Sequence, residues 1–118
     1  MNYALLIYET AAGFAMRADP KKSQAYWAGF AAYTKALQDA GVMVASAGLQ
    51  LPDTATTLKL DDGRRLVQDG PYADTKEQLG GFFIINVPDL DTALEWAARI
   101  PAAAGGVIEL RPKLERPC

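Results

Sequence analysis

The sequence predicts one α+β domain, in which two helices cover one face of an antiparallel sheet. Three observations lead to this prediction. A length of 118 residues suits a single domain, and 50% of the residues are apolar, which is enough for one core. Apolar or alternating segments typical of strands are interspersed with two segments of helical periodicity. Their order along the chain is strand, helix, strand, hairpin, strand, helix, strand, in which both helices can cover one face.

The first strand is expected over residues 3–8. This segment, Tyr-Ala-Leu-Leu-Ile-Tyr, is apolar on both faces of a two-residue period, which is typical of an interior strand covered on both sides. Residues 9–18, which contain Gly13, are expected to form a loop.

A long helix is expected to follow. Asp19 before Pro20 provides an N-cap and a residue favoured at the first helical position, and Gly41 is placed to end the helix. Within it, four apolar side chains recur at spacings of four, three and four and form one stripe: Tyr26, Phe30, Tyr33 and Leu37.

The middle of the chain predicts a strand followed by a hairpin. Residues 42–51 are expected to form a strand that ends at Pro52. Residues 55–60 alternate apolar and polar types, as in a half-exposed strand. Residues 61–63, Asp-Asp-Gly, are a hairpin signal, so residues 64–68 should pair back on the preceding strand.

Residues 69–81 predict a rigid loop. Asp69 can close an Asx-type turn, Gly70 supplies a backbone conformation that other residues avoid, and Pro71 ends strand pairing. Thr75 and Gln78 stand at capping-box spacing, so residues 75–79 are expected to form one helical turn, which the two glycines at 80 and 81 then break.

The last third of the chain predicts strand, helix and strand. Residues 81–87 form a strand, and Pro88-Asp89 opens a helix that ends before Pro101, with Arg99 complementing the helix dipole. Four side chains share one face of this helix: Leu90, Ala93, Leu94 and Ala97. Residues 107–110 form the final strand, which completes a ferredoxin-like βαβ(ββ)βαβ plan in a single domain over residues 1–118.

The second face of this sheet needs a cover. Two helices shield only one face, whereas residues 3–7 and 82–85 supply apolar side chains to both. A second copy of the chain can cover the other face by a twofold contact between sheets, and obligate dimers bury about 2,000 Å² or more. We therefore expect a homodimer.

Composition excludes several classes of function. A formal charge of −2 and a pI near 5.0 argue against a nucleic-acid partner. No apolar run approaches the ~20 residues that span a bilayer, and the first residues lack a basic leader, so we expect no membrane partner and a cytoplasmic location. No phosphate-binding glycine loop is present.

Histidine and cysteine usage excludes further chemistry. The chain has no His, and Cys118, its only cysteine, stands last, so we interpret it as an exposed, incidental thiol. Ser-His-Asp and Cys-His catalysis, zinc sites and haem ligation by His are unavailable within one chain. We expect neither a metal nor another cofactor.

The residue 69–81 loop carries the candidate catalytic groups. Asp69, Asp74 and Glu77 are candidate acid/base carboxylates, and Lys76 could hold an anionic group. The alternatives are a turn-closing role for Asp69 and a solvated role for the other three. Tyr72 could line a pocket and donate a hydrogen bond, or fill a subunit seam without any ligand.

Other candidate ligand-binding residues lie outside the loop. Tyr8, Tyr26 and Trp27, with Tyr33, could line an aromatic cleft between helix and sheet, although aromatic residues at helical spacing are more often core. Arg111 and Glu109 alternate with Leu110 on the last strand, so Arg111 could bind an anionic ligand or pair with a carboxylate across the sheet, and we favour the ion pair.

Residues 69–82, Asp-Gly-Pro-Tyr-Ala-Asp-Thr-Lys-Glu-Gln-Leu-Gly-Gly-Phe, resemble the signature of the DGPF group of YCII-related proteins. The likeness extends to residues 55–57, 93–99 and 109–112, so it covers nearly the whole chain. It implies a ferredoxin-like subunit paired into a dimeric α/β barrel, without an assigned general activity. Association of some members with extracytoplasmic-function sigma factors implies a regulatory connection. A His and Asp pair proposed as catalytic in the wider group does not carry over to a chain without His.

Three functional hypotheses follow. The first is a homodimer that binds a small organic molecule in a cleft beside residues 69–81. The second is a regulatory protein-binding module linked to sigma factors. The third is a cofactor-free acid/base isomerase or lyase-like enzyme that uses Asp69 or Asp74 with Tyr72.

Overall fold

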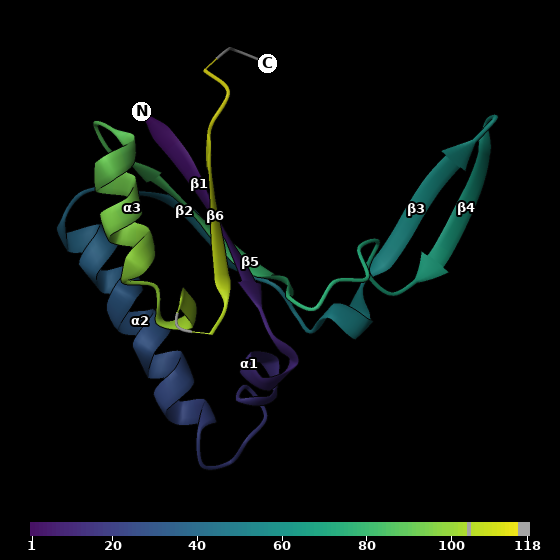
Figure 1. Ribbon diagram of the computed structural model, residues 1–118, viewed down its shortest axis with the longest axis horizontal. Helices are drawn as coiled ribbons and strands as arrows, with labels where there is room; N and C mark the ends of the chain where they lie inside the picture. The colour runs from purple at the N-terminus through teal and green to yellow at the C-terminus, as the bar shows by residue number, and fades with distance from the viewer. Residues whose placement is uncertain (104, 116–118) are drawn as a thin grey trace.

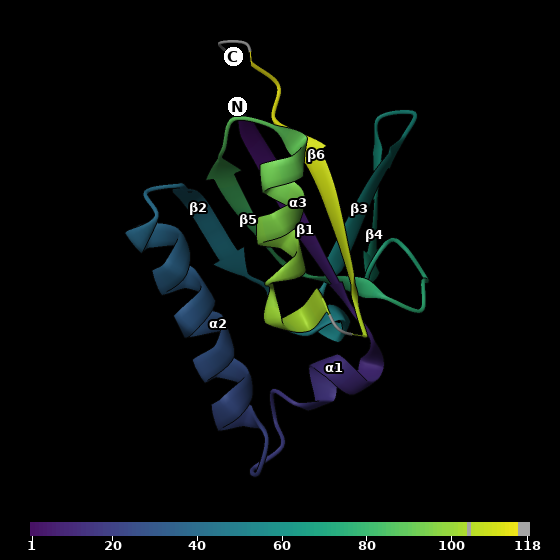
Figure 2. The same cartoon turned by 60° about the vertical axis from the view of Figure 1, so that its left-hand side comes forward.

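The protein is built around a four-stranded antiparallel sheet with the strand order β2-β5-β1-β6. The computed structural model describes residues 1–103 and 105–115, so the expectation for Cys118 lies outside the described residues. The strands of the sheet are β1 (Asn2–Glu9), β2 (Met43–Gly48), β5 (Gln78–Asn86) and β6 (Val107–Pro112). The helices α2 (Ser23–Asp39) and α3 (Leu90–Ala98) lie on one side of this sheet (Figures 1 and 2). This arrangement confirms the ferredoxin-like α+β prediction.

The core lies between this sheet and the two helices. In β1 every second side chain from Tyr3 onward is buried, so Leu5 and Ile7 point toward the helices. Leu37 of α2 and Ile85 of β5 are fully buried beside them. Burying one such aliphatic side chain stabilises the fold by about 1.5–3 kcal/mol. From the predicted stripe of α2, Tyr33 and Leu37 therefore belong to the core, and Phe30 packs against it partly buried.

Helix ends agree with the sequence signals at most positions. Gly41, with φ at +73°, follows α2 in the left-handed conformation that glycine favours. The amides of Gly41 and Val42 donate to the carbonyls of Gln38 and Leu37, which is the Schellman pattern. Asp89 caps α3 by accepting from the Thr92 amide at 2.8 Å. No helix in the described part of the chain is both long and apolar enough to cross a membrane.

Three local predictions in the first half of the chain need correction. Residues 9–18 are not all loop, because β1 extends to Glu9 and a short helix, α1 (Ala11–Ala15), follows, capped by Thr10. The helix expected at Asp19 begins at Ser23, because the Asp19 carboxylate closes a turn by accepting from the amides of Lys21 and Lys22. The strand expected over residues 42–51 ends at Gly48, and a short 3-10 helix, η1 (Pro52–Thr54), follows.

The helical turn predicted over residues 75–79 is wrong. Gln78 already begins β5, and the glycines at 80 and 81 lie inside that strand. Gly81 pairs with Ile7 of β1 and Gly48 of β2, and Gly80 is the extra residue where the register with β1 shifts. Thr75 donates its hydroxyl to the Glu77 carbonyl and does not cap a helix. Pairing with two neighbouring strands satisfies more backbone groups than one helical turn could, so the sheet prevails over the capping-box spacing.

Only part of the predicted face of α3 is buried. Ala93 and Ala97 pack in the core, where Ile100 follows them, but Leu90 and Leu94 are 50% and 48% exposed. A short 3-10 helix, η2 (Pro101–Ala103), follows α3 where Pro101 was expected to end it. The two alanines therefore form the buried face of α3, while the leucines remain at the surface.

The predicted hairpin forms but does not join the main sheet. Strands β3 (Thr56–Asp61) and β4 (Arg64–Asp69) make a separate two-stranded sheet that projects from the body of the molecule as an arm (Figure 1). Asp62 and Gly63 at its tip both have positive φ, as a type I′ turn requires. Apolar side chains along the arm are largely exposed, among them Leu60 at 67%.

The face of the main sheet away from the helices is apolar and uncovered by any described element. Leu6 lies opposite Phe82, and Ala4 opposite Ile84, in the pairing of β1 with β5. These four side chains and Tyr8 are only partly buried. We call this surface the open sheet face.

Candidate functional site

A cleft of about 660 Å³ lies beside the loop that follows β4. Three segments far apart in the chain form its walls: the end of β1 with α1, the segment around η1, and residues 69–78. Its charged lining residues are Glu9, Asp53, Asp69, Asp74 and Lys76. Its apolar lining residues are Ala11, Phe14, Leu51, Pro52 and Pro71. The cleft thus combines carboxylates, one amine and an apolar wall.

The rim of the cleft depends on the Asp-Gly-Pro corner. Gly70 has φ at +98°, in the region that strongly favours glycine. Its amide donates to the Ala55 carbonyl at 2.7 Å, and its carbonyl accepts from the Thr57 hydroxyl at 2.8 Å. These two bonds tie the corner to the start of β3, so Asp69 and Pro71 are held at the edge of the cleft.

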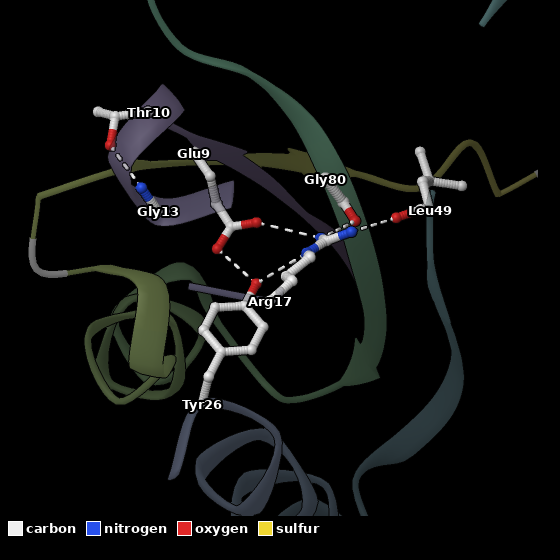
Figure 3. Close-up of polar contacts among 7 residues, drawn as sticks. All are labelled: Glu9, Thr10, Gly13, Arg17, Tyr26, Leu49 and Gly80. Carbon is white, nitrogen blue, oxygen red and sulfur yellow. Dashed lines mark hydrogen bonds and ion pairs between the residues drawn. The ribbon is translucent and has the colours of Figure 1, made fainter. Parts of the chain in front are cut away.

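Glu9 is the buried charged residue of this region and is only 3% exposed. It occupies the last position of the alternating buried face of β1. Its Oε1 accepts from the Tyr26 hydroxyl at 2.7 Å, and its Oε2 accepts from Nη2 of Arg17 at 3.2 Å (Figure 3). A buried carboxylate is strongly destabilising unless it is paired and hydrogen-bonded, and here both conditions are met.

Arg17 joins four parts of the chain. Besides Glu9, its guanidinium donates to the Leu49 carbonyl at 2.6 Å, to the Gly80 carbonyl at 3.2 Å and to the Tyr26 hydroxyl at 3.3 Å (Figure 3). Its Cζ atom lies 5.0, 5.9 and 5.4 Å from the ring centroids of Phe14, Tyr26 and Trp27. The planar fork of an arginine suits this set of acceptors better than a lysine would.

The glycines at 80 and 81 make room for this arrangement. A Cβ atom at position 80 would lie 2.7 Å from Oε2 of Glu9 and 3.1 Å from Nη2 of Arg17. A Cβ atom at position 81 would lie 2.8 Å from the Ala47 carbonyl oxygen in β2. The missing side chain at Gly80 therefore leaves space for the Glu9–Arg17 ion pair, and the missing side chain at Gly81 leaves space for β2.

Comparison with known proteins places the chain in a family. Residues 1–115 match the model of the YCII-related domain. The chain belongs to the YCII-related family. It is also similar to an uncharacterized protein of Rhizobium meliloti (strain 1021), with 41% identity over 76 residues. That match covers 63% of this chain and 61% of the relative, so it spans less than two thirds of the relative's length.

In this YCII-related domain, the environment of Tyr26, which donates a hydrogen bond to the buried carboxylate of Glu9, changes its pKa. Burial, together with the hydrogen bond to Glu9, raises the pKa of Tyr26 to about 12, and Arg17 opposes the rise. The phenol therefore stays protonated at neutral pH and serves as a donor to Glu9.

The predicted catalytic residues do not all meet in one cavity of the YCII-related domain. Asp69, Asp74 and Lys76 line the 660 Å³ cleft. Tyr72, which is 87% exposed, lines a second cleft of about 560 Å³ together with Tyr8. The two clefts border the same loop but have different walls.

The remaining predicted ligand-binding residues lie elsewhere. Tyr26 and Trp27 line a small pocket of about 150 Å³ beside α2. Glu77 is half-buried at the end of the loop. Arg111 forms the favoured ion pair, but with Glu109 on its own strand at 2.9 Å and not with a carboxylate across the sheet, and both side chains are solvent-accessible. Within the described residues, no group of three or more His, Cys, Asp or Glu side chains is placed to hold a metal ion.

Sequence reasoning missed Glu9 and Arg17. The sequence does contain a signal for Glu9, because Glu9 is the next position in the two-residue alternation that places Tyr3, Leu5 and Ile7 on the buried face. A carboxylate at a position expected to be buried indicates a partner elsewhere in the chain. Arg17 carries no such signal, since its partners at Leu49 and Gly80 come from distant segments.

Proposed function

We propose that this YCII-related protein is a homodimer that binds a small organic molecule in the 660 Å³ cleft beside the residue 69–81 loop. The observation that carries the proposal is the cleft itself. Its volume falls within the roughly 300–1,000 Å³ range of small-molecule sites. Its lining, a few charged groups against an apolar wall, is typical of such sites.

The charges of the cleft indicate what the ligand presents. Arg17 balances Glu9, which leaves Asp53, Asp69 and Asp74 against Lys76. Carboxylates accept hydrogen bonds and attract cations. A ligand with hydroxyl or amine donors near Asp69 and Asp74, and an apolar part against Phe14 and Leu51, would therefore complement the cleft.

The open sheet face supports the homodimer. Its apolar side chains, including Leu6, Phe82 and Ile84, have no cover among the described elements. A twofold contact between two such faces removes them from water without any further element. Tyr8 belongs to this face and borders the second cleft, so that cleft would lie at the margin of the dimer contact.

The cleft proposal can be tested by ligand screening with matched variants. We expect saturable thermal shifts and amide chemical-shift changes with members of a broad metabolite panel. Asp74→Asn and Lys76→Ala should weaken these responses, whereas Lys59→Ala on the arm should not, because Lys59 is exposed and does not line the cleft. A panel without any saturable response, or equal responses in all three variants, would contradict the proposal.

A protein-binding role is the second candidate, and the arm favours it. Leu58, Leu60 and Val67 are 53%, 67% and 55% exposed on a hairpin that projects from the body. Isolated two-stranded hairpins are marginally stable in water, so a partner that covers these side chains would stabilise the arm. A stoichiometric partner recovered from the native cell by the wild type, and lost with Leu58→Ser/Leu60→Ser, is the expected result. Equal recovery by both proteins would contradict the role of the arm.

An acid/base enzyme is the third hypothesis, and the positions of its candidate residues indicate which of them could act together. Asp69 and Asp74 border the cleft that Glu9 also borders, whereas Tyr72 borders the other one. Catalysis by Asp74 therefore would not require Tyr72, and Asp74→Asn alone should abolish turnover of a bound substrate. Retained turnover in Asp74→Asn would remove this residue from the mechanism.

A further inference from the structure

The small pocket beside α2 lies between this helix and the edge of the sheet formed by β2 and β5. Its volume is about 150 Å³. Tyr26, Trp27 and Phe30 line it from the helix, with ring centroids 4.7–6.4 Å apart. Glu9 borders both this cavity and the large cleft, but the other walls differ. We call it the aromatic pocket.

The pocket exists because the sheet lacks large side chains at this level. Farther along α2, the Tyr33 ring packs edge-on against Phe83 with centroids 5.1 Å apart, and the core is filled. At the level of Tyr26 and Phe30, the strands instead present Ser46, Gly48 and the two glycines of β5. A Cβ atom at Gly48 would have no neighbour within 4 Å, which shows how much room is left there.

The pocket is accessible and lined for a ring. Trp27 is 47% exposed, so one wall is a large aromatic surface that a ligand can reach from solvent. Aromatic rings prefer edge-to-face or offset contacts with other rings, and each such contact is worth about 0.5–1.5 kcal/mol beyond its buried area. An apolar cavity of about 150 Å³ holds one benzene-sized ring.

The polar groups of the pocket indicate the charge of its ligand. Arg17 and Glu9 are both in the lining, but they are paired with each other, so the pocket offers neither a positive nor a negative excess. The hydroxyls of Thr34 and Ser46 provide uncharged donors and acceptors. A charged ring would lose its hydration without gaining an opposite charge.

We propose that the aromatic pocket binds a neutral compound with a single aromatic ring and one hydrogen-bonding substituent, of which phenol is the simplest example. The ring contacts Trp27 and Phe30, and the substituent bonds to the hydroxyl of Ser46 or Thr34. This site is separate from the large cleft and does not depend on the ligand of that cleft.

The test is an NMR titration of the full chain with phenol, followed at the two tryptophan indole N–H groups. Trp27 lines the pocket, whereas Trp96 packs against Tyr33 and Arg99 outside it and serves as an internal control. Trp27→Phe and Trp96→Phe assign the two signals. We expect a saturable shift of the Trp27 indole with phenol while the Trp96 indole stays in place. No shift, or equal shifts of both, would overturn the proposal.

Two variants locate the binding. Ser46 pairs with the buried Phe83 in the register of β2 with β5, so it faces α2, and Ser46→Leu should fill the pocket and weaken phenol binding at least tenfold. Thr56→Leu on the arm adds a similar side chain away from the pocket and should leave binding unchanged. Circular dichroism verifies that both variants fold. Equal phenol affinity in Ser46→Leu and wild type would place the ligand elsewhere and overturn the proposal.

Charged analogues of phenol test the class of ligand. Benzoate and benzylammonium should bind at least tenfold more weakly than phenol, and equal binding of either would contradict the neutral class.

A second variant of the pocket wall, Trp27→Ala, keeps the proposal testable if Ser46→Leu does not fold. Trp27→Ala removes an exposed wall that the core does not need, so the protein should fold but bind phenol at least fivefold more weakly. Unchanged affinity in folded Trp27→Ala would also overturn the proposal.

Discussion

Gly80 of β5 lies directly against the carboxylate of Glu9 in β1. A Cβ atom at position 80 would be 2.7 Å from Oε2 of Glu9, closer than the Cβ atoms of folded proteins come to other heavy atoms. The buried ion pair of Glu9 with Arg17 therefore depends on a residue without a side chain at one position of the neighbouring strand. This dependence links the glycine pair after the Asp-Gly-Pro loop to the first strand.

We predict that Gly80→Ala destabilises the protein. The added methyl group must displace Glu9, Arg17 or the Phe14 ring, and overpacking of this kind costs about 1–3 kcal/mol. Gly48→Ala is the matched control, since its Cβ atom meets nothing within 4 Å, and it should change the free energy of unfolding by no more than about 0.5 kcal/mol. Urea denaturation of both variants checks this prediction. Equal stabilities would show that the ion pair tolerates a side chain at position 80.

Removal of Arg17 should be more severe. Arg17→Ala leaves the buried Glu9 without its cation and removes a hydrogen bond from the Leu49 carbonyl, at a cost of about 3–5 kcal/mol. Adding Glu9→Gln to Arg17→Ala should recover part of this loss, because a neutral amide is less costly to bury than a carboxylate. Denaturant unfolding of the two single variants and the double variant measures the coupling. Additive losses would contradict a direct interaction.

Tyr26 should make stability depend on pH in the alkaline range. Its folded-state pKa, about 12, lies above the usual tyrosine value of 10.0, so the folded state holds the phenolic proton more tightly than the unfolded state does. The resulting stabilisation is complete below pH 10 and is lost as pH rises from about 10 to 12.

Tyr26→Phe should reduce this alkaline loss of stability. Burial also raises the pKa of Tyr33, so some dependence on pH remains in the variant. Tyr72→Phe, at an 87% exposed position, retains Tyr26 and should retain the full loss. Thermal unfolding at a series of pH values, together with tyrosinate absorbance, follows the effect. An unchanged pH dependence in Tyr26→Phe would contradict the assignment to Tyr26.

A charge on the open sheet face should dissociate the proposed dimer. Ile84→Glu would place a carboxylate at the centre of the contact without a partner, which is strongly unfavourable in an apolar interface. Leu60→Glu on the exposed arm is the control and should leave the assembly unchanged. Sedimentation velocity should show a dimer for the wild type and Leu60→Glu, and a folded monomer for Ile84→Glu. A wild-type monomer at micromolar concentration would contradict the dimer itself.

The sequence by itself determined the order of the six strands and of α2 and α3, and most of their ends, but not α1. The alternation around Leu5, the stripe through Tyr33 and Leu37, the stop at Gly41 and the Asp62-Gly63 turn are all local signals, carried by residues within a few positions of one another. Such signals act through side-chain periodicity and backbone conformation, so they can be recognised without knowing the partner segments.

Only the tertiary structure decided how the candidate site is assembled. Thr75 and Gln78 have capping-box spacing, but pairing of β5 with β1, in which Gln78 lies opposite Glu9, draws Gln78 into the sheet. Arg17 donates to the carbonyls of Leu49 and Gly80, which are far from it in the sequence. Tyr72 and Asp74 are only two positions apart in the sequence, yet they border different clefts. These relations arise from strand pairing between distant segments, and no local propensity encodes which distant backbone a side chain will meet.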